Sequence, residues 1–211
     1  MAKVAILFDF DDTLVETWQP KWAQHQEVAL RFYGRPLDEA AISAHWGKPS
    51  KELVQHFYGS DQPVEQMLEN FHSLDSQYPK VLMPATLSVL SELSARGYVL
   101  GIVSNGRKAS VSLDIERLRI PRKHFEFVHA YEDTRAYKPD PRAFELALSV
   151  LQGMDISDVV YVGDSLSDLE ASRSAGVAFV GVTSGLTNRK SFVRAGASRV
   201  VDNLDELLDV F

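Results

Sequence analysis

Acidic residues cluster directly after the first apolar run of the chain. Asp9, Asp11 and Asp12 follow the run Val4–Phe8 within four positions. Like charges this close repel one another, so the cluster is unfavourable unless a cation lies among the carboxylates. Residues two apart in an extended segment point the same way, which lets Asp9 and Asp11 share one site. Taken alone, the cluster fits either a cation site or a solvated acidic turn.

Two further segments carry groups suited to an anion. Ser104 and Asn105 follow the apolar run Val99–Val103, and Gly106 and a predicted helix come next. A hydroxyl and the backbone N–H groups of a helix start favour phosphate. Lys138, which precedes another predicted helix, is a point charge that would pair with phosphate and keep a nearby carboxylate ionised. By themselves, these segments also fit an ordinary turn and a solvated lysine.

A second pair of acids follows a later apolar run. Asp164 comes soon after Val159–Val162, and Asp168 lies four residues further on, where a helix is predicted. An Asp at the start of a helix can cap it and interact with its dipole. The same side chain can also belong to a binding site, so the two roles do not exclude each other.

The elements that must position these residues alternate along the chain. Short apolar runs bounded by turn residues predict buried strands, and the amphipathic stretches between them predict helices. The expected strands are Val4–Phe8, Val99–Val103, Phe125–Val128, Val159–Val162 and Ala178–Val182. The expected helices lie near residues 86–96, 107–118, 141–152, 166–175, 188–195 and 204–210. This alternation predicts an α/β fold, a Rossmann-like parallel sheet with helices on both faces.

One long segment breaks the alternation. Roughly 70 residues separate the first strand from the next βα unit, too many for a structureless loop in a compact domain. Their apolar spacing is helical, and we expect Trp18, Trp22 and Phe32 to belong to the core of these helices. The sequence therefore predicts a small α-helical cap at residues 16–82, inserted into an α/β core of residues 1–15 and 83–211. Linkers near residues 13–17 and 79–84 would join the two.

The carboxyl ends of parallel strands form one edge of a sheet, where such folds bind their ligands. Asp9, Ser104 and Asp164 each follow a predicted strand, and Lys138 precedes a helix that leads into another strand. We therefore expect these side chains to meet in one site at this edge.

With these segments in order, the whole chain resembles the haloacid dehalogenase superfamily of phosphohydrolases. The four motifs of that family correspond to Asp9-Phe10-Asp11-Asp12-Thr13, Ser104-Asn105, Lys138-Pro139 and Gly163-Asp164-Ser165-Leu166-Ser167-Asp168. The helical insert resembles the cap of the subgroup that contains phosphoglycolate phosphatase and β-phosphoglucomutase. Asp12 is a departure, because many relatives have Gly there.

The resemblance implies a mechanism. Asp9 would attack phosphorus to form an aspartyl-phosphate, and Asp11 would protonate the leaving oxygen and later activate water. Mg²⁺ would be held by Asp9, the backbone carbonyl of Asp11, and Asp164. The presence of Asp11 favours phosphate esters over halides, because relatives that remove halide lack this acid.

Other motif residues receive supporting roles by the same resemblance. Ser104 and the N–H of Asn105 would bind phosphoryl oxygens, and Lys138 would neutralise negative charge. Asp168 would orient Lys138 or the groups that bind the metal, and Thr13 is expected beside those groups. In the cap, we expect the loop His45–Pro49 to meet the leaving group, with Lys48 pairing with an anionic substrate. A simple helix connection with a solvated Lys48 fits that loop equally well.

These observations favour a Mg²⁺-dependent phosphatase acting on a small phosphorylated metabolite. A phosphomutase of the same capped type is the nearest alternative, followed by a non-catalytic phospho-acceptor module and a former enzyme that now only binds a partner. The formal net charge of -7 argues against nucleic-acid binding, and the lack of cysteine excludes disulfides and thiolate metal sites. The apolar runs are too short to cross a bilayer, so we expect a cytoplasmic protein without membrane contact. The sequence leaves the substrate and the oligomeric state open.

Overall fold

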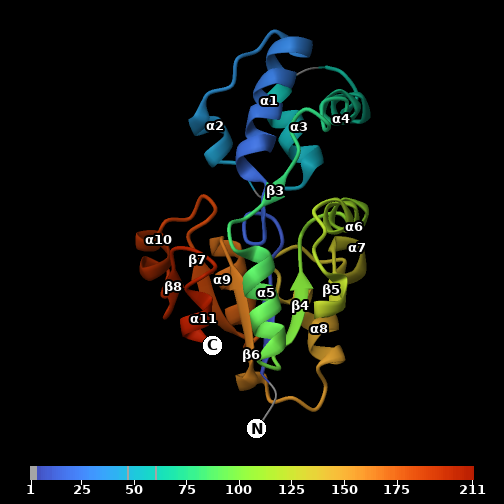
Figure 1. Ribbon diagram of the computed structural model, residues 1–211. Helices are drawn as coiled ribbons and strands as arrows, with labels where there is room; N and C mark the ends of the chain where they lie inside the picture. The colour runs from blue at the N-terminus through green and yellow to red at the C-terminus, as the bar shows by residue number, and fades with distance from the viewer. Residues whose placement is uncertain (1–3, 47, 60) are drawn as a thin grey trace. The chain divides into compact units, whose positions relative to one another are not determined.

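The structure is a computed structural model that describes residues 4–46, 48–59 and 61–211 (Figure 1). The chain forms two compact units. The first consists of Met1–Glu16 and Val81–Phe211, and the second consists of Thr17–Lys80. The boundaries expected from the sequence, after residue 15 and before residue 83, lie close to these. They differ because the chain leaves and re-enters the first unit as a two-stranded antiparallel ribbon, β2 (Val15–Glu16) and β3 (Val81–Leu82).

Within the described part of the chain, six strands form a parallel sheet in the order β5-β4-β1-β6-β7-β8. The strands are β1 (Ala5–Phe8), β4 (Val99–Val103), β5 (Phe125–His129), β6 (Val159–Gly163), β7 (Ala178–Val182) and β8 (Val200–Val201). All four residues of β1 are buried, as expected for a central parallel strand covered on both faces. The predicted Rossmann-like α/β fold is therefore confirmed.

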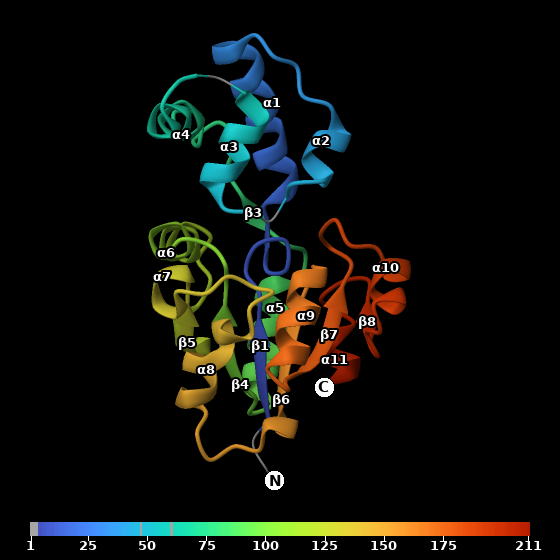
Figure 2. The same cartoon turned by 180° about the vertical axis from the view of Figure 1, so that it is seen from behind.

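Side chains alternate between the two faces of the sheet. Ile6 and Phe8 belong to a hydrophobic cluster with α5, α6 and α11, whereas Ala5 and Leu7 belong to a second cluster with α8, α9 and α10. Figure 1 shows α5 in front of the sheet, and Figure 2 shows α8 and α9 in front of the opposite face. The helices are α5 (Thr86–Ala95), α6 (Lys108–Arg117), α7 (Tyr131–Thr134), α8 (Glu145–Val150), α9 (Leu166–Ser174), α10 (Arg189–Arg194) and α11 (Leu207–Val210).

Several details of the first unit differ from the sequence-based expectation. The helix expected at residues 141–152 is divided into a 3₁₀ turn, η2 (Pro141–Phe144), and the shorter α8. Strand β8 was not predicted, because two residues carry no detectable alternation. The ribbon of β2 and β3 was expected only as linkers. Two further 3₁₀ turns, η1 (Arg122–His124) and η3 (Ile156–Asp158), lead into β5 and β6.

The second unit is helical and has its own core. Its helices are α1 (Trp18–Tyr33), α2 (Glu39–Ser43), α3 (Ser50–Tyr58) and α4 (Val64–His72). Trp18 and Trp22 stack with ring centroids 6.1 Å apart and pack against this core. The prediction for Phe32 was wrong: it lies in the last turn of α1 and is 39% exposed, whereas the next residue, Tyr33, stacks on Tyr58 of the core. In the described residues of both units, we find no helix with the length and apolar character needed to cross a bilayer.

Candidate active site

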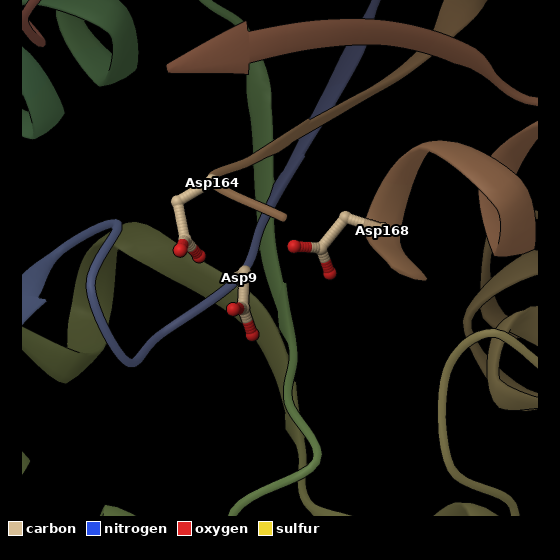
Figure 3. Close-up of side chains that lie close together, drawn as sticks. All are labelled: Asp9, Asp164 and Asp168. Carbon is tan, nitrogen blue, oxygen red and sulfur yellow. The ribbon is translucent and has the colours of Figure 1, made fainter. Parts of the chain in front are cut away.

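Asp9 lies at the carboxyl edge of the sheet, directly after β1. Its backbone N–H donates to the carbonyl oxygen of Val162 at 2.8 Å, which fixes it against the neighbouring strand β6. Asp164 follows the last residue of β6, so both acids leave adjacent parallel strands at the same edge. Among the described residues, carboxylate oxygens of Asp9, Asp164 and Asp168 lie within 4.8 Å of one another. Figure 3 shows these three side chains around a common space.

Asp168 has both roles that its sequence position suggested. Its Oδ2 accepts hydrogen bonds from the backbone N–H and the hydroxyl of Ser165, at 3.0 and 2.5 Å. The Ser165 hydroxyl in turn accepts from the N–H of Asp168, which completes a capping box at the start of α9. The other carboxylate oxygen, Oδ1, lies 2.7 Å from the ammonium of Lys138. One buried side chain therefore begins a helix and pairs with a lysine.

Lys138 brings its charge into the acidic cluster. Its Nζ lies 2.7 Å from Oδ1 of Asp9 and 2.5 Å from the hydroxyl of Tyr161, and its side chain is only 2% exposed. Burial alone lowers the pKa of Lys138, but the carboxylates of Asp168 and Asp9 outweigh burial and raise it. The ammonium therefore stays charged and offsets part of the negative charge of the site.

Asn105 supports Lys138 through its side chain. Its Oδ1 accepts from the backbone N–H of Lys138 at 2.8 Å, and its Nδ2 donates to the carbonyl oxygen of the same residue at 3.2 Å. From the sequence, Asn105 was expected only to bind phosphate through its backbone N–H. The amide side chain adds a structural role, because it fixes the loop that carries the lysine.

Ser104 and Asp11 meet at Gly106. The Ser104 hydroxyl accepts from the N–H of Gly106 at 3.0 Å. A methyl group built on Gly106 would lie 3.1 Å from that hydroxyl oxygen and 3.2 Å from Oδ2 of Asp11. The half-buried Asp11 carboxylate and the buried Ser104 hydroxyl therefore flank the same glycine. This places an acid and a hydroxyl on the same glycine, after strand β4 at the carboxyl edge of the sheet.

Residues after Asp9 and in the loop after β7 surround Asp164. Thr13 is buried, with its hydroxyl 3.4 Å from Oδ1 of Asp164. Asp12 is buried at a φ of +59°, a conformation that favours Gly and that Asp tolerates better than most residues. The Ser184 hydroxyl donates to the carbonyl oxygen of Asp12 at 2.5 Å. Gly185 approaches so closely that a methyl group there would lie 1.9 Å from Oδ2 of Asp164.

Tyr161, Ser184 and Gly185 were not singled out from the sequence. A tyrosine inside an apolar strand does carry a usable signal, because its buried hydroxyl must find a partner. The sequence around Ser184 and Gly185 is typical of an ordinary turn. Only the folded structure shows that they lie beside Asp12 and Asp164. Lys48 is exposed in the second unit, and Gly47 of the predicted specificity loop lies outside the described residues. The role expected for Lys48 therefore stays a prediction.

The acidic cluster fits a hard divalent cation. Burial raises the pKa of Asp9 to about 7, even though Lys138 opposes the shift, and burial raises the pKa of Asp164 well above its usual value. Both shifts reflect buried carboxylates with too little positive charge around them. Oxygen ligands of this kind suit Mg²⁺ and similar ions. Because both oxygens of Asp168 already contact Ser165 or Lys138, Asp9 and Asp164 are the side chains best placed to bind a metal.

The chain matches a known protein family over most of its length. The family model described as haloacid dehalogenase-like hydrolase matches residues 6–182. A phosphoglycolate phosphatase of Yersinia pseudotuberculosis is 26% identical over 213 residues, covering 96% of this chain and 90% of the relative.

Solved structures share the fold over nearly the whole chain. A protein from Haemophilus somnus described as a predicted phosphoglycolate phosphatase has a TM-score of 0.85 at 22% identity, covering 99% of this chain and 97% of its own. A candidate β-phosphoglucomutase from Thermotoga maritima has a TM-score of 0.82 at 24% identity, covering 98% and 97%.

Proposed function

This chain belongs to the haloacid dehalogenase-like hydrolases, and from that premise we propose that it is a metal-dependent phosphatase of small phosphomonoesters. The observation that carries the proposal is the position of the Asp9 carboxylate. It lies 2.7 Å from the Lys138 ammonium and within 4.8 Å of an oxygen of Asp164, at the ligand-binding edge of a parallel sheet. A carboxylate placed between a fixed cation and a potential metal ligand is suited to attack phosphorus.

In the first step, an oxygen of Asp9 forms a bond to phosphorus while the bond from phosphorus to the ester oxygen breaks. Asp11 gives its proton to the departing oxygen. In the second step, a water molecule attacks phosphorus, gives a proton to Asp11, and the bond between phosphorus and Asp9 breaks. The products are an alcohol and inorganic phosphate, and both carboxyl groups return to their starting states.

Three groups would stabilise the transferring phosphoryl group. The Ser104 hydroxyl and the N–H of Asn105 donate to its oxygens, and the Lys138 ammonium balances negative charge. A divalent cation, which we propose to be Mg²⁺, would be held by Asp9, Asp164 and the carbonyl of Asp11. When bound, it supplies the positive charge that lets an anionic carboxylate approach an anionic phosphate.

The proposal is tested by phosphate release from a panel of phosphomonoesters, with Mg²⁺ and with a chelator. 2-Phosphoglycolate belongs in the panel because curated relatives carry the name phosphoglycolate phosphatase. We expect the parent protein to turn over at least one ester with Mg²⁺ only. Asp9→Asn should remove turnover, because the amide keeps the shape but lacks the attacking charge.

Asp155→Asn is the matched control. Asp155 is exposed before β6, at the opposite end of that strand from Asp164, and Asn can still cap the short turn η3. It should leave turnover unchanged. Turnover that survives in Asp9→Asn would overturn the covalent mechanism, and absence of phosphate release from every ester would overturn the proposed activity.

The same panel distinguishes a phosphomutase, which returns the phosphoryl group to the sugar. Analysis of products from sugar phosphates would show an isomer in place of free phosphate. A phospho-acceptor module would yield phosphate only in stoichiometric amount.

A further inference from the structure

Tyr161 occupies a place in the site that the proposed mechanism does not use. It lies on the central strand β6, is fully buried, and directs its hydroxyl at the acidic cluster. Its ring packs edge-on against Phe144, with centroids 4.8 Å apart at 87°. Phe144 belongs to the turn η2, which begins two residues after Pro139. The ring of Tyr161 thus contacts the segment that follows Lys138, and its hydroxyl contacts the Lys138 ammonium.

The hydrogen bonds around Lys138 define what the hydroxyl does. An ammonium has three protons and no acceptor, so every contact to it must be an acceptor. Its neighbours are Asp9 at 2.7 Å, Asp168 at 2.7 Å and the hydroxyl of Tyr161 at 2.5 Å. Because the tyrosine oxygen accepts one ammonium proton, its own proton is free to be donated elsewhere.

The Tyr161 proton has a well-placed acceptor on the neighbouring strand. The hydroxyl lies 2.9 Å from the carbonyl oxygen of Val103, compared with 3.3 Å from Oδ1 of Asp168. The ammonium is also 3.3 Å from the Val103 carbonyl, a longer and weaker contact. The shortest set of contacts is therefore a chain from Lys138 to Tyr161 to Val103.

We propose that the Tyr161 hydroxyl is a positioning group that ties the Lys138 ammonium to the end of strand β4. Val103 directly precedes Ser104, so the chain of hydrogen bonds joins the lysine to the strand that carries the proposed phosphate-binding hydroxyl. Two carboxylates alone leave the flexible lysine side chain free to move between them. The third contact fixes the ammonium at a set position beside Asp9. The catalytic part of this inference rests on the proposed function; the positioning itself does not.

The positioning is tested first in the metal-free parent protein, without any turnover. The ¹⁵N-edited NMR signal of the Lys138 ammonium is assigned by its loss in Lys138→Arg. Three hydrogen bonds in a buried site should make its protons exchange slowly with water and show a contact to the Tyr161 hydroxyl proton. In Tyr161→Phe, the ring is kept and the hydroxyl is lost, so the signal should shift and exchange at least about tenfold faster. An ammonium signal in fast exchange in the parent, or one unchanged in the variant, would overturn the proposal.

Kinetics then measures what the position contributes. Tyr161→Phe should lower kcat by about 10- to 100-fold, the effect of losing one hydrogen bond to a charged group, while KM changes by less than about threefold. Tyr98→Phe is the matched control, because it removes a hydroxyl that bonds the carbonyl of Phe211 in the same unit. The control should keep kcat. A Tyr161→Phe variant with the kcat of the parent would contradict the catalytic part. If the parent hydrolyses no ester, the proposed function fails, and the NMR result alone decides the positioning.

Discussion

The side chain of Asn105 holds the backbone of Lys138 from two sides, accepting from its N–H at 2.8 Å and donating to its carbonyl oxygen at 3.2 Å. The two residues are 33 positions apart and come from different loops at the carboxyl edge of the sheet. The amide pair sets the path of the loop, and the contacts at Asp9, Asp168 and Tyr161 set the position of the ammonium. Lys138 is therefore fixed at both its backbone and its charged end.

Loss of the amide should release the lysine loop. We expect Asn105→Ala to lose about 1–3 kcal/mol of stability, because two hydrogen bonds disappear and their backbone partners stay half-buried. Turnover should fall by about tenfold or more. Asn203→Ala is the control: it removes two hydrogen bonds of an exposed amide, both with Glu206, and should leave kcat unchanged and lose less stability than Asn105→Ala. Thermal unfolding and kcat measured on both variants check the prediction, and equal behaviour of the two would contradict it.

The two roles of Asp168 should separate by substitution. Asn at this position can still accept from the N–H of Ser165 and cap α9, but it cannot pair with the Lys138 ammonium as an anion. We expect Asp168→Asn to retain most of its stability and to lose at least about tenfold in kcat. Asp168→Ala should lose a further ~1 kcal/mol, because the cap is also gone. Full kcat in a folded Asp168→Asn would show that the ion pair does not matter for turnover.

The sequence alone predicted the strand ends well, because short apolar runs bounded by polar residues show where a buried strand stops. Asp9 and Asp164 were placed at one edge of the sheet on that basis. Asn105 shows the limit of this reasoning. Its side-chain partner lies across two loops, and the path of a loop depends on tertiary contacts that no periodic pattern records. The same holds for Gly185: its sequence context is typical of a turn, and only the structure shows that it packs against Asp164.

Other features that the sequence did not predict are the exposure of Phe32, strand β8 and the partner of the Tyr161 hydroxyl. Phe32 has the spacing of a core residue, yet it is 39% exposed, because the core contact at the end of α1 is made by Tyr33, which stacks on Tyr58. Strand β8 is only two residues long, so a pattern with a period of two cannot reveal it. The position of Tyr161 was predicted as strand, but the partner of its hydroxyl became visible only with the fold.

The stability of the metal-free protein should fall as pH rises from about 4 to about 7. Burial raises the pKa of Asp9 to about 7 from the ordinary 3.8, so the folded protein keeps a proton that the unfolded chain loses. Stability from this group is complete below about pH 4 and is lost as pH rises toward about 7. The slope would be at most about 1.4 kcal/mol per pH unit for each proton. Asp164 adds to the effect, because its pKa is also raised.

Thermal unfolding in chelator across this range checks the sign. We expect the melting temperature to fall as pH rises, with a smaller slope in Asp9→Asn, which has no proton to lose. Mg²⁺ should stabilise the protein more at the higher pH, because it competes with protons for the same carboxylates. A melting temperature that rises with pH in chelator, to the same extent in both proteins, would contradict the prediction.

Lys48 tests whether the second unit takes part in substrate selection. Its ammonium is exposed in the connection between α2 and α3, and the sequence suggests that it pairs with an anionic substrate. We expect Lys48→Ala to lower kcat/KM by about 3- to 30-fold for the preferred ester, mainly through KM. Lys51→Ala is the matched control, because Lys51 is exposed in the same unit and pairs with the exposed Glu65. A value of kcat/KM that stays the same in Lys48→Ala across the ester panel would exclude this role.

Gly185 should matter for metal binding through Asp164. A methyl group at this position would lie 1.9 Å from Oδ2 and 2.7 Å from Cγ of Asp164, so the carboxylate must move in Gly185→Ala. We expect the dissociation constant for Mg²⁺, measured by calorimetry, to rise by about 10- to 100-fold, as when a group that orients a ligand is disturbed. Gly153→Ala is the control: Gly153 has open space around it but a φ of +95°, so Ala there should cost stability without changing Mg²⁺ affinity. If a folded Gly185→Ala variant bound Mg²⁺ as tightly as the parent, Asp164 would not bind the metal in the position that Gly185 permits.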